Sequence, residues 1–301
     1  MLERHKIDTV LHLAAQTSVD KSFKDPTLFT VVNVLGTQRL LEACRASRYL
    51  TLFLYCSTDE VCGESSDVRL SEKAPLQPTN PYSASKAAAE LLVRSYAKSF
   101  ALPIIVTRCV NVYGPRQFPE KLIPKFVLRL ARGQACCIHG SGVARRSFIH
   151  IDDVAAAFDV VIHSGTAGEV YNIGSNETLS ILEVAEQISE LVRNAPADIE
   201  WVPDRLYNDA VYALDDGKLR SLGWRCTVNW KLGLERTVRW YLSYAADLDP
   251  GDPDPRSHTA PYWDSSAVGR ALQPHSALDG FGQASGSRAA SVKKSEVPRG
   301  E

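Results

Sequence analysis

Two adjacent acids, Asp59 and Glu60, follow an apolar run, "TLFLYC", and a pair of hydroxyl residues, Ser57 and Thr58. The apolar run predicts a buried strand, so the acids fall where that strand ends in a loop. Neighbouring carboxyl groups raise each other's pKa, and perturbed carboxyls are more frequent at functional sites than in surface loops. Adjacent residues point to opposite faces of a strand, so we expect a turn to bring both acids to one substrate.

A second stretch, "NPYSASKAAAE", places Tyr82 and Lys86 four residues apart at the start of a predicted helix. Side chains with this spacing emerge on one face of the helix. A nearby ammonium group favours the phenolate, so we expect Lys86 to lower the pKa of Tyr82 toward the range in which it takes a proton from an alcohol. Taken alone, the spacing is more typical of an exposed helical pair, and the neighbouring motifs must decide.

Short apolar runs alternate with segments of helical period around these two motifs. The predicted strands are "DTVLHLA", "TLFLYCS" and "PIIVTRCV", and the helices between them run from about Pro26 to Ser47 and from about Tyr82 to Phe100. This alternation indicates βαβ units around a parallel sheet, so the predicted class is α/β with a Rossmann-like, doubly wound sheet. Later helices near 122–132, from 152, over "SILEVAEQISELV" and over "NWKLGLERTVRWYLSYA", with strands "RSFIHI" and "EVYNIG", predict a smaller C-terminal α/β lobe over the strand ends.

These patterns divide the chain into three segments. We expect a partial dinucleotide-binding domain over residues 1–113, and a mainly substrate-binding lobe over 114–246 with some segments that return to the first domain. Residues 247–301 are rich in Pro, Gly, Ser and charge and poor in periodic apolar residues. Such a composition predicts a disordered tail.

Composition narrows the possible partners. The chain has 301 residues, 45% hydrophobic and 23% charged, with a formal net charge of -1, which predicts a globular protein without the basic surface that binds nucleic acids or membranes. No apolar run is long enough to span a bilayer, and charges interrupt "MLERHKIDTV", so we expect a cytoplasmic protein. The 7 cysteines and 7 histidines show no metal-ligand spacing, and no metal is expected.

Seven successive blocks resemble a known family. They are "HLAAQTSVDKS", "STDEVCG", "PTNPYSASKAAAE", "TRCVNVYGPRQFPEKLIPKF", "IHGSGVARRSFIHIDDV", "YNIGSNETLSILEVA" and "PDRLYNDAVYALDDGKLRSLGW". Their order is similar to that of the extended short-chain dehydrogenase/reductase superfamily, and within it they most resemble the dTDP-glucose 4,6-dehydratases, in particular those of animals. The resemblance implies NAD as cofactor, a nucleotide sugar as substrate and a homodimer formed through the helix after Pro26 and the helix of Tyr82.

The resemblance also implies a redox-neutral loss of water. Tyr82 would act as base on the sugar 4-hydroxyl during oxidation by NAD, with Lys86 on the cofactor ribose and Thr58 hydrogen-bonded to the reacting oxygen. Glu60 would then take the C5 proton of the 4-ketone, and Asp59 would donate a proton to the departing C6 hydroxyl. The adjacent acids would thus be the acid and base of a hydro-lyase.

Matching the blocks assigns further binding residues. The resemblance implies that the cofactor contacts are Ala14, Ala15, Gln16, Ser57, Tyr82, Lys86 and Cys109. It implies that the substrate contacts are Asn111, Lys121, Leu122, Arg146 and Arg205, where the planar guanidinium groups are suited to phosphate. The sequence departs from the family pattern at Cys62, Val110 and Val211, where relatives commonly have Tyr, Ser and Arg.

The family also opens with a Gly-rich turn that receives the cofactor pyrophosphate at a helix N-terminus. This chain begins at "MLERHKIDTVLHLAAQ", immediately before the strand that corresponds to the family's fourth. We therefore expect the first strands and the glycine turn to be missing, and the chain as given to be inactive. Two alternatives stay open: a UDP-sugar 4-epimerase or decarboxylase, which has no task for the Asp59/Glu60 pair, and a catalytically inactive truncated paralogue or isoform.

Overall fold

The computed structural model describes residues 1–64, 69–207 and 213–244, all of which belong to one compact unit spanning residues 1–260. Val211 and the predicted tail at 247–301 lie outside the described residues. Within the described ranges, no helix combines the length and the apolar character needed to cross a membrane.

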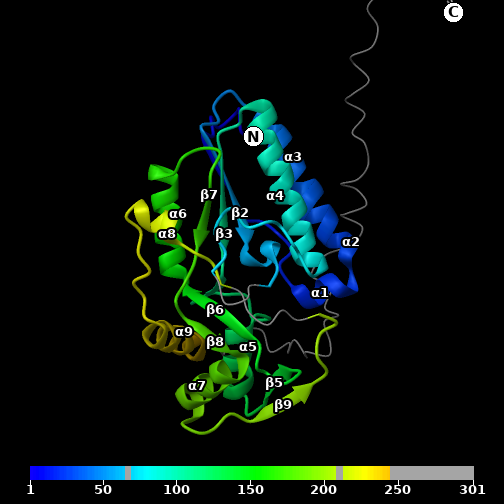
Figure 1. Cartoon of the computed structure of the whole chain (residues 1–301). Coiled ribbons are helices and arrows are strands. Elements are labelled where there is room, and N and C mark those ends of the chain that lie inside the picture. Colours follow the sequence, from blue (N-terminus) through cyan, green and yellow to red (C-terminus); the bar gives the residue numbers. More distant parts are fainter. Residues whose placement is uncertain (65–68, 208–212, 245–301) are drawn as a thin grey trace, which may run out of the picture. The chain divides into compact units, whose positions relative to one another are not determined.

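A four-stranded parallel sheet forms the centre of the N-terminal half (Figure 1). All three strand pairs are parallel, and helices lie between consecutive strands of the sheet along the chain, so the predicted α/β class with a parallel sheet is confirmed. The strand order is β1 (Thr9–His12), β2 (Leu52–Thr58), β3 (Ile104–Cys109) and β7 (Val170–Ile173).

Helices cover both faces of this sheet, and alternate residues of β2 show how. Phe53 and Tyr55 point to one face and pack in the cluster that includes side chains of α3 (Gly36–Arg45) and α4 (Pro81–Phe100). Leu54 points to the other face and packs in the cluster of α6 (Ile151–Ser164), with α8 (Gly217–Ser221) beside it (Figure 1). A strand buried on both faces explains why its sequence is a continuous apolar run.

The helix predicted from Pro26 to Ser47 is three consecutive pieces. After α1 (Val19–Lys24), which the sequence did not predict, come α2 (Pro26–Phe29), a π-helical segment (Thr30–Leu35) and α3. Asn33 lies in the π-helical segment, and its buried Nδ2 donates to the Gln16 carbonyl and to Ser85 Oγ, at 2.9 Å each. This amide therefore connects the end of the β1 loop to α4.

The C-terminal lobe contains α5 (Leu122–Ala131), α7 (Ile181–Arg193) and α9 (Trp230–Tyr244), which pack on a shared apolar core. The predicted helices of this lobe are confirmed. The sequence did not predict its shortest strands, because three or four residues show no usable period. The unpredicted strands are β4 (Asn111–Tyr113), β5 (Cys136–His139), β8 (Thr178–Ser180) and β9 (Ile199–Val202). With β6 (Arg145–His150), which matches the predicted strand "RSFIHI", they are arranged as β4-β6-β8 and β5-β9.

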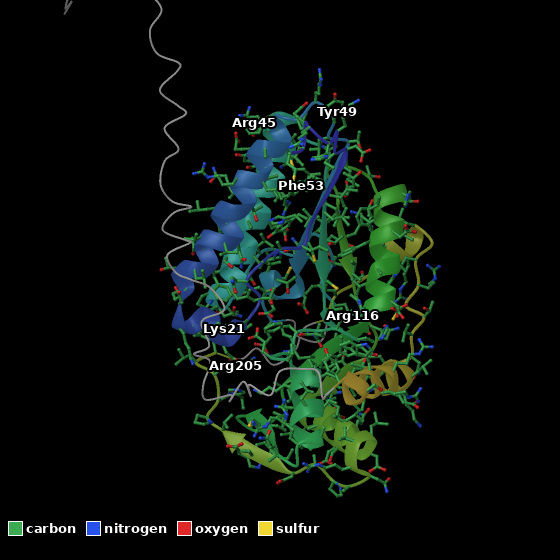
Figure 2. The ribbon with its side chains drawn as sticks, turned by 180° about the vertical axis from the view of Figure 1, so that it is seen from behind. Lys21, Arg45, Tyr49, Phe53, Arg116 and Arg205 are labelled. Atoms are coloured by element: carbon green, nitrogen blue, oxygen red, sulfur yellow. The ribbon has the colours of Figure 1, made fainter. Side chains whose placement is uncertain are left out.

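The segment Thr17–Lys21 joins the parallel sheet to this lobe. Lys21 Nζ lies 2.7 Å from Glu120 Oε2, and Arg205 Nε donates to Asp20 Oδ1 at 2.7 Å. Figure 2 shows Lys21 and Arg205 close together, at the other end of the sheet from Arg45 and Tyr49. These charged contacts border the carboxyl ends of the parallel strands, where α/β sheets bind their ligands.

Candidate active site

The acid pair lies in a single 3-10 turn (Asp59–Cys62) directly after β2. Asp59 Oδ1 accepts hydrogen bonds from Thr58 Oγ1 and from the Glu60 backbone N–H, both at 3.0 Å. Gly63 ends the turn with φ 73°, and a Cβ there would come within 2.4 Å of the Gln77 carbonyl oxygen. Only glycine suits that position. The expected turn is therefore present. Because Asp59 and Glu60 lie in this turn and not in the strand, their side chains do not have to point to opposite faces of the sheet.

The helix that carries Tyr82 begins beside this turn. Asn80 caps α4: its Oδ1 accepts from the Ser83 N–H at 2.9 Å, and Ser83 Oγ accepts from the Asn80 N–H at 3.1 Å. Pro81 occupies the first helical position, where its missing N–H costs nothing. The Asn80 Nδ2 group donates to Glu60 Oε2 at 3.1 Å. The start of α4 is thus hydrogen-bonded to one of the two acids.

The expected effect of Lys86 on Tyr82 is wrong. Burial raises the pKa of Tyr82 well above its usual value, and the negative charge of Glu60 raises it further. Lys86 Nζ donates to the Cys56 carbonyl at 2.7 Å and lies over the Tyr55 ring, and its own pKa is lowered by burial to about 8. The cost of burying the Tyr82 phenolate outweighs any attraction to the Lys86 charge, because both side chains are almost fully buried.

Burial also determines the acidity of the pair. It raises the pKa of Asp59 to about 7, with a further contribution from the charge of Glu60. It raises the pKa of Glu60 too, but the Asn80 hydrogen bond and the charges of Arg146, Arg205 and Lys121 oppose that rise. The two adjacent carboxyl groups therefore experience different surroundings: Glu60 faces a donor and three cations, and Asp59 is buried behind it.

Two adjoining cavities meet at the acid pair. The acid-pair cavity has a volume of about 310 Å³ and is lined by Ser57, Thr58, Asp59, Glu60, Tyr82, Cys109, Asn111, Lys121 and Leu122, among others. The arginine cavity has a volume of about 190 Å³ and is lined by Asp20, Glu60, Asn80, Asn111, Lys121, Leu122, Arg146, Arg205 and Tyr207, among others. Glu60, Asn111 and Lys121 belong to both, so the cavities form one continuous site.

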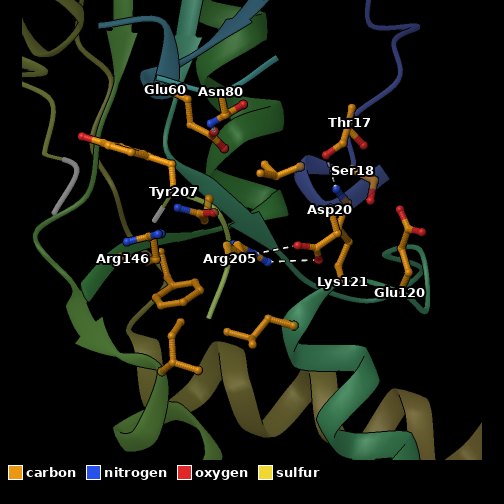
Figure 3. Close-up of a pocket in the computed structure, with 15 residues that line it drawn as sticks. Thr17, Ser18, Asp20, Glu60, Asn80, Glu120, Lys121, Arg146, Arg205 and Tyr207 are labelled. Carbon is orange, nitrogen blue, oxygen red and sulfur yellow. Dashed lines mark hydrogen bonds and ion pairs between the residues drawn. The ribbon is translucent and has the colours of Figure 1, made fainter. Parts of the chain in front are cut away.

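All of the residues expected to contact substrate line the arginine cavity. Figure 3 shows Glu60 beside Asn80, and Arg205 joined to Asp20 by two hydrogen bonds, of 2.7 and 3.2 Å. Lys121 Nζ donates to the Thr17 carbonyl at 2.7 Å, and burial lowers its pKa. The cavity therefore brings three cationic side chains, Lys121, Arg146 and Arg205, together with the carboxylates of Asp20, Glu60 and Glu120.

The residues expected to contact cofactor are more scattered. Ser57, Tyr82 and Cys109 line the acid-pair cavity, and the buried Ser57 Oγ has no hydrogen-bond partner among the described residues. Ala14, Ala15, Gln16 and Lys86 line neither of the two cavities. Across the described ranges, no group of three His, Cys, Asp or Glu side chains is placed to hold a metal ion.

Sequence reasoning missed two residues of the site. Asn80 appeared only as part of a quoted motif, although its position before a proline and three residues before Ser83 is a recognisable helix cap. Its second contact, to Glu60, depends on tertiary structure. Asp20 gave no local signal at all, because its partner, Arg205, lies 185 residues away in the sequence.

Comparison with known sequences identifies the family. The profile of the GDP-mannose 4,6 dehydratase family matches residues 1–237. The chain belongs to this family.

Individual members are similar over most of the described region. A dTDP-D-glucose 4,6-dehydratase of Bos taurus is 45% identical over 247 residues, which cover 80% of this chain and 69% of the bovine protein. A trifunctional protein of Arabidopsis thaliana, a UDP-glucose 4,6-dehydratase, 3,5-epimerase and reductase, is 50% identical over 239 residues. The match covers 78% of this chain but 36% of the plant protein.

Solved structures give the same result for the fold. The dTDP-glucose 4,6-dehydratase of Streptomyces venezuelae, crystallised with NAD bound, superimposes with a TM-score of 0.78 at 38% identity and covers 81% of this chain and 76% of its own. A UDP-glucose 4-epimerase of Thermus thermophilus in complex with NAD gives a TM-score of 0.75 at 32% identity, with 80% and 79% covered. The fold of this family member is therefore the Rossmann-like fold of nucleotide-sugar dehydratases and epimerases, as expected.

Proposed function

We propose that the chain carries the active site of a nucleotide-sugar 4,6-dehydratase that uses NAD. The observation that carries the proposal is the placement of Asp59 and Glu60 in one turn that borders the same cavity as Tyr82. A 4-epimerase would use Tyr82 and Lys86 but has no task for two acids at this position. The relatives that support the proposal act, by their names, on dTDP-glucose and UDP-glucose.

The residues near Ser57 are compatible with the nicotinamide end of the cofactor. Ser57 lines the acid-pair cavity, and its buried Oγ has no hydrogen-bond partner among the described residues, as is frequent at binding sites. Ser57, Cys109, Lys86 and the Ala14–Gln16 segment would hold NAD, which when bound would supply reversible oxidation at the sugar C4.

The chain's own groups would move the protons. Tyr82, whose hydroxyl is paired with Thr58, would take the proton of the sugar 4-hydroxyl. Its raised pKa in the ligand-free site means that it needs a further positive charge, which the cofactor would supply when bound, to act as a base. Glu60 would remove the proton at C5, and Asp59, with a pKa near 7, would stay protonated often enough to give a proton to the departing C6 hydroxyl.

The arginine cavity would hold the diphosphate. Arg146 and Arg205 line the arginine cavity alone, and Lys121 and the Asn111 amide line both cavities, so these four residues would supply positive charge and a hydrogen-bonding amide. We propose further that residues 1–113 bind the cofactor, that residues 114–246 mainly bind the substrate, and that the protein acts as a homodimer in the cytoplasm. The exposed Leu91 and Phe100 of α4 are compatible with a helix-mediated dimer.

The decisive experiment compares wild type with Glu60→Gln, each extended at the N-terminus by a homologous Gly-rich segment because the chain as given is expected to be inactive. Both proteins are assayed in deuterated water, with NAD and either dTDP-glucose or UDP-glucose. We expect the wild type to form a 4-keto-6-deoxy sugar with deuterium at C5. We expect Glu60→Gln to lower dehydration by about 10²- to 10⁴-fold, the range typical of a lost general base, while oxidation at C4 stays detectable by absorbance at 340 nm. Formation of the 4-epimer without loss of water would contradict the proposal.

Binding can be tested without cofactor. Calorimetric titration with dTDP should show that Arg146→Ala weakens binding by about tenfold or more, because a charged hydrogen bond contributes roughly 1.5 to 3 kcal/mol. Arg145→Ala is the matched control, since Arg145 is adjacent but pairs with Glu183 outside the cavity. Equal losses in the two variants would show that the arginine cavity is not the diphosphate site.

A further inference from the structure

The hydrogen bond between Asn80 and Glu60 is oriented by the helix cap. An asparagine amide has one acceptor end and one donor end. The Asn80 Oδ1 is occupied by the Ser83 N–H in the capping box, so the Nδ2 end must face Glu60 Oε2, at 3.1 Å. The helix cap therefore orients the Asn80 amide so that its N–H₂ group, and not its oxygen, contacts Glu60.

A pure donor favours the ionised state of a carboxyl group. An N–H group bonds more strongly to a charged carboxylate oxygen than to the carbonyl oxygen of a neutral acid, and it cannot accept a hydrogen bond from the O–H of that acid. Asp59 also accepts from a pure donor, the Glu60 N–H, but its second partner is the Thr58 hydroxyl, which can donate to a carboxylate or accept from a neutral acid; both contacts are 3.0 Å. The hydroxyl partner therefore distinguishes Asp59 from Glu60.

The other groups around Glu60 are charged or titratable and come from several elements. Asp59 is its neighbour in the turn and Tyr82 faces it from α4, and the charge of Glu60 raises the pKa of both. Arg146, Arg205 and Lys121 favour its ionisation from the far side of the cavity. Those cations would be shared with an anionic ligand, whereas Asn80 would remain with Glu60.

We propose that Asn80 is a positioning residue, which stabilises the ionised form of Glu60 against its burial and orients it while the helix cap holds Asn80. The assignment of Glu60 as the base rests on the proposed function. The stabilisation of ionised Glu60 by Asn80 does not, because it follows from the hydrogen bond.

Three variants separate this role from capping. Asn80→Ser keeps a good N-cap residue but removes the donor to Glu60. Asn80→Asp keeps the cap and replaces the donor by a carboxylate. Ser83→Ala weakens the capping box and leaves the Asn80 amide in place, so it is the control for a purely structural effect.

The first readout is the titration of Glu60 in the ligand-free chain, followed by carbon-13 NMR of labelled glutamate carboxyls and assigned by the signal lost in Glu60→Gln. We expect Asn80→Ser to raise the pKa of Glu60 by about one unit, as the loss of one hydrogen bond to a charged group should. Asn80→Asp should raise it further, and Ser83→Ala should leave it unchanged. An unchanged pKa in Asn80→Ser, or an equal rise in Ser83→Ala, would overturn the proposal.

The second readout is the pH dependence of deuterium exchange at C5 with nucleotide sugar and NAD, in the protein extended by the homologous Gly-rich segment. Asn80→Ser should lose about tenfold in rate at low pH, where Glu60 becomes protonated, and should recover above the raised pKa. A uniform loss at every pH would indicate misplacement instead and would contradict the electrostatic role. If wild type exchanges no deuterium while the NMR shifts occur as expected, the proposed function fails and the role of Asn80 stands.

Discussion

Asp59, after β2, and Asp153, in the first turn of α6, are almost equally buried, with 3% and 2% of their surface exposed. Their pKa values move in opposite directions. Asp153 accepts hydrogen bonds from the Thr227 and Val228 N–H groups and from Thr227 Oγ1, and these donors lower its pKa. Asp59 accepts on one oxygen only, its Oδ2 has no partner among the described residues, and its pKa rises to about 7.

Depth of burial and hydrogen-bond donors both contribute to this difference, because burial is the largest cause of the rise at Asp59 and the donors outweigh burial at Asp153. Asp153 accepts hydrogen bonds from the segment that leads into α9, and these bonds hold that segment to α6. Asp59 lines the acid-pair cavity with one oxygen that has no partner among the described residues, and such incomplete bonding is typical of a carboxyl group at a functional site.

The largest expected effect concerns a third buried carboxylate, Glu90. It receives two hydrogen bonds from Arg108, at 2.6 and 3.2 Å, and neither side chain is exposed. Glu90→Ala should lower the free energy of unfolding by about 3 to 5 kcal/mol, because Arg108 would stay buried without its partner. Urea denaturation measures this. Glu235→Ala, which breaks an exposed pair with Arg239 in α9, should cost well under about 1 kcal/mol. Similar losses would show that burial is not the deciding factor.

An intermediate effect is expected from the matched pair Asp153→Asn and Asp59→Asn. At pH 8, Asp153→Asn should lower the free energy of unfolding by about 2 kcal/mol, because an amide N–H₂ would face backbone donors. Asp59→Asn should raise stability instead, because it removes a buried charge that is poorly compensated. A loss of stability in both variants would remove the distinction between the two sites.

The contributions of Asp153 and Asp59 to the free energy of unfolding should also change in opposite directions with pH. The pKa of Asp153 in the folded protein lies below its unfolded value of about 4. Asp153 therefore contributes fully to stability above about pH 4, and this stability is lost as the pH falls through the folded pKa. Folded Asp59 holds its proton up to about pH 7, so its ionisation reduces stability as the pH rises from about 4 to 7. The advantage of Asp59→Asn over wild type should therefore grow across that window and be absent at pH 4.

The smallest expected effect compares two serine hydroxyls. Ser57 Oγ has no hydrogen-bond partner among the described residues, whereas Ser180 Oγ accepts from the Glu183 N–H in the capping box of α7. Ser57→Ala should leave the melting temperature unchanged or slightly raised, and Ser180→Ala should cost about 1 kcal/mol. If Ser57→Ala proved the more destabilising change, the unpaired hydroxyl would have a structural partner after all.

The sequence predicted most elements and the main members of the site, because these depend on local patterns. The run "TLFLYCS" and the spacing of Tyr82 from Lys86 are visible in any short window. The direction of the Tyr82 pKa shift could not be predicted in this way, because it depends on how deeply the start of the helix is buried. The partners of Asp20 and Glu60 were also hidden, since they come from segments that meet only in the folded chain.

The 3-10 turn at Asp59–Cys62 has a mechanical consequence. Because the acid and base are consecutive residues of one turn, covalent geometry fixes their separation, and thermal motion carries them together. Tyr82 belongs to another element, linked to this turn through Asn80. Loosening of the site should therefore change the distance from the acids to Tyr82 long before it changes the distance between the acids. The oxidation and dehydration halves of the reaction would lose alignment with each other while the acid pair stayed intact.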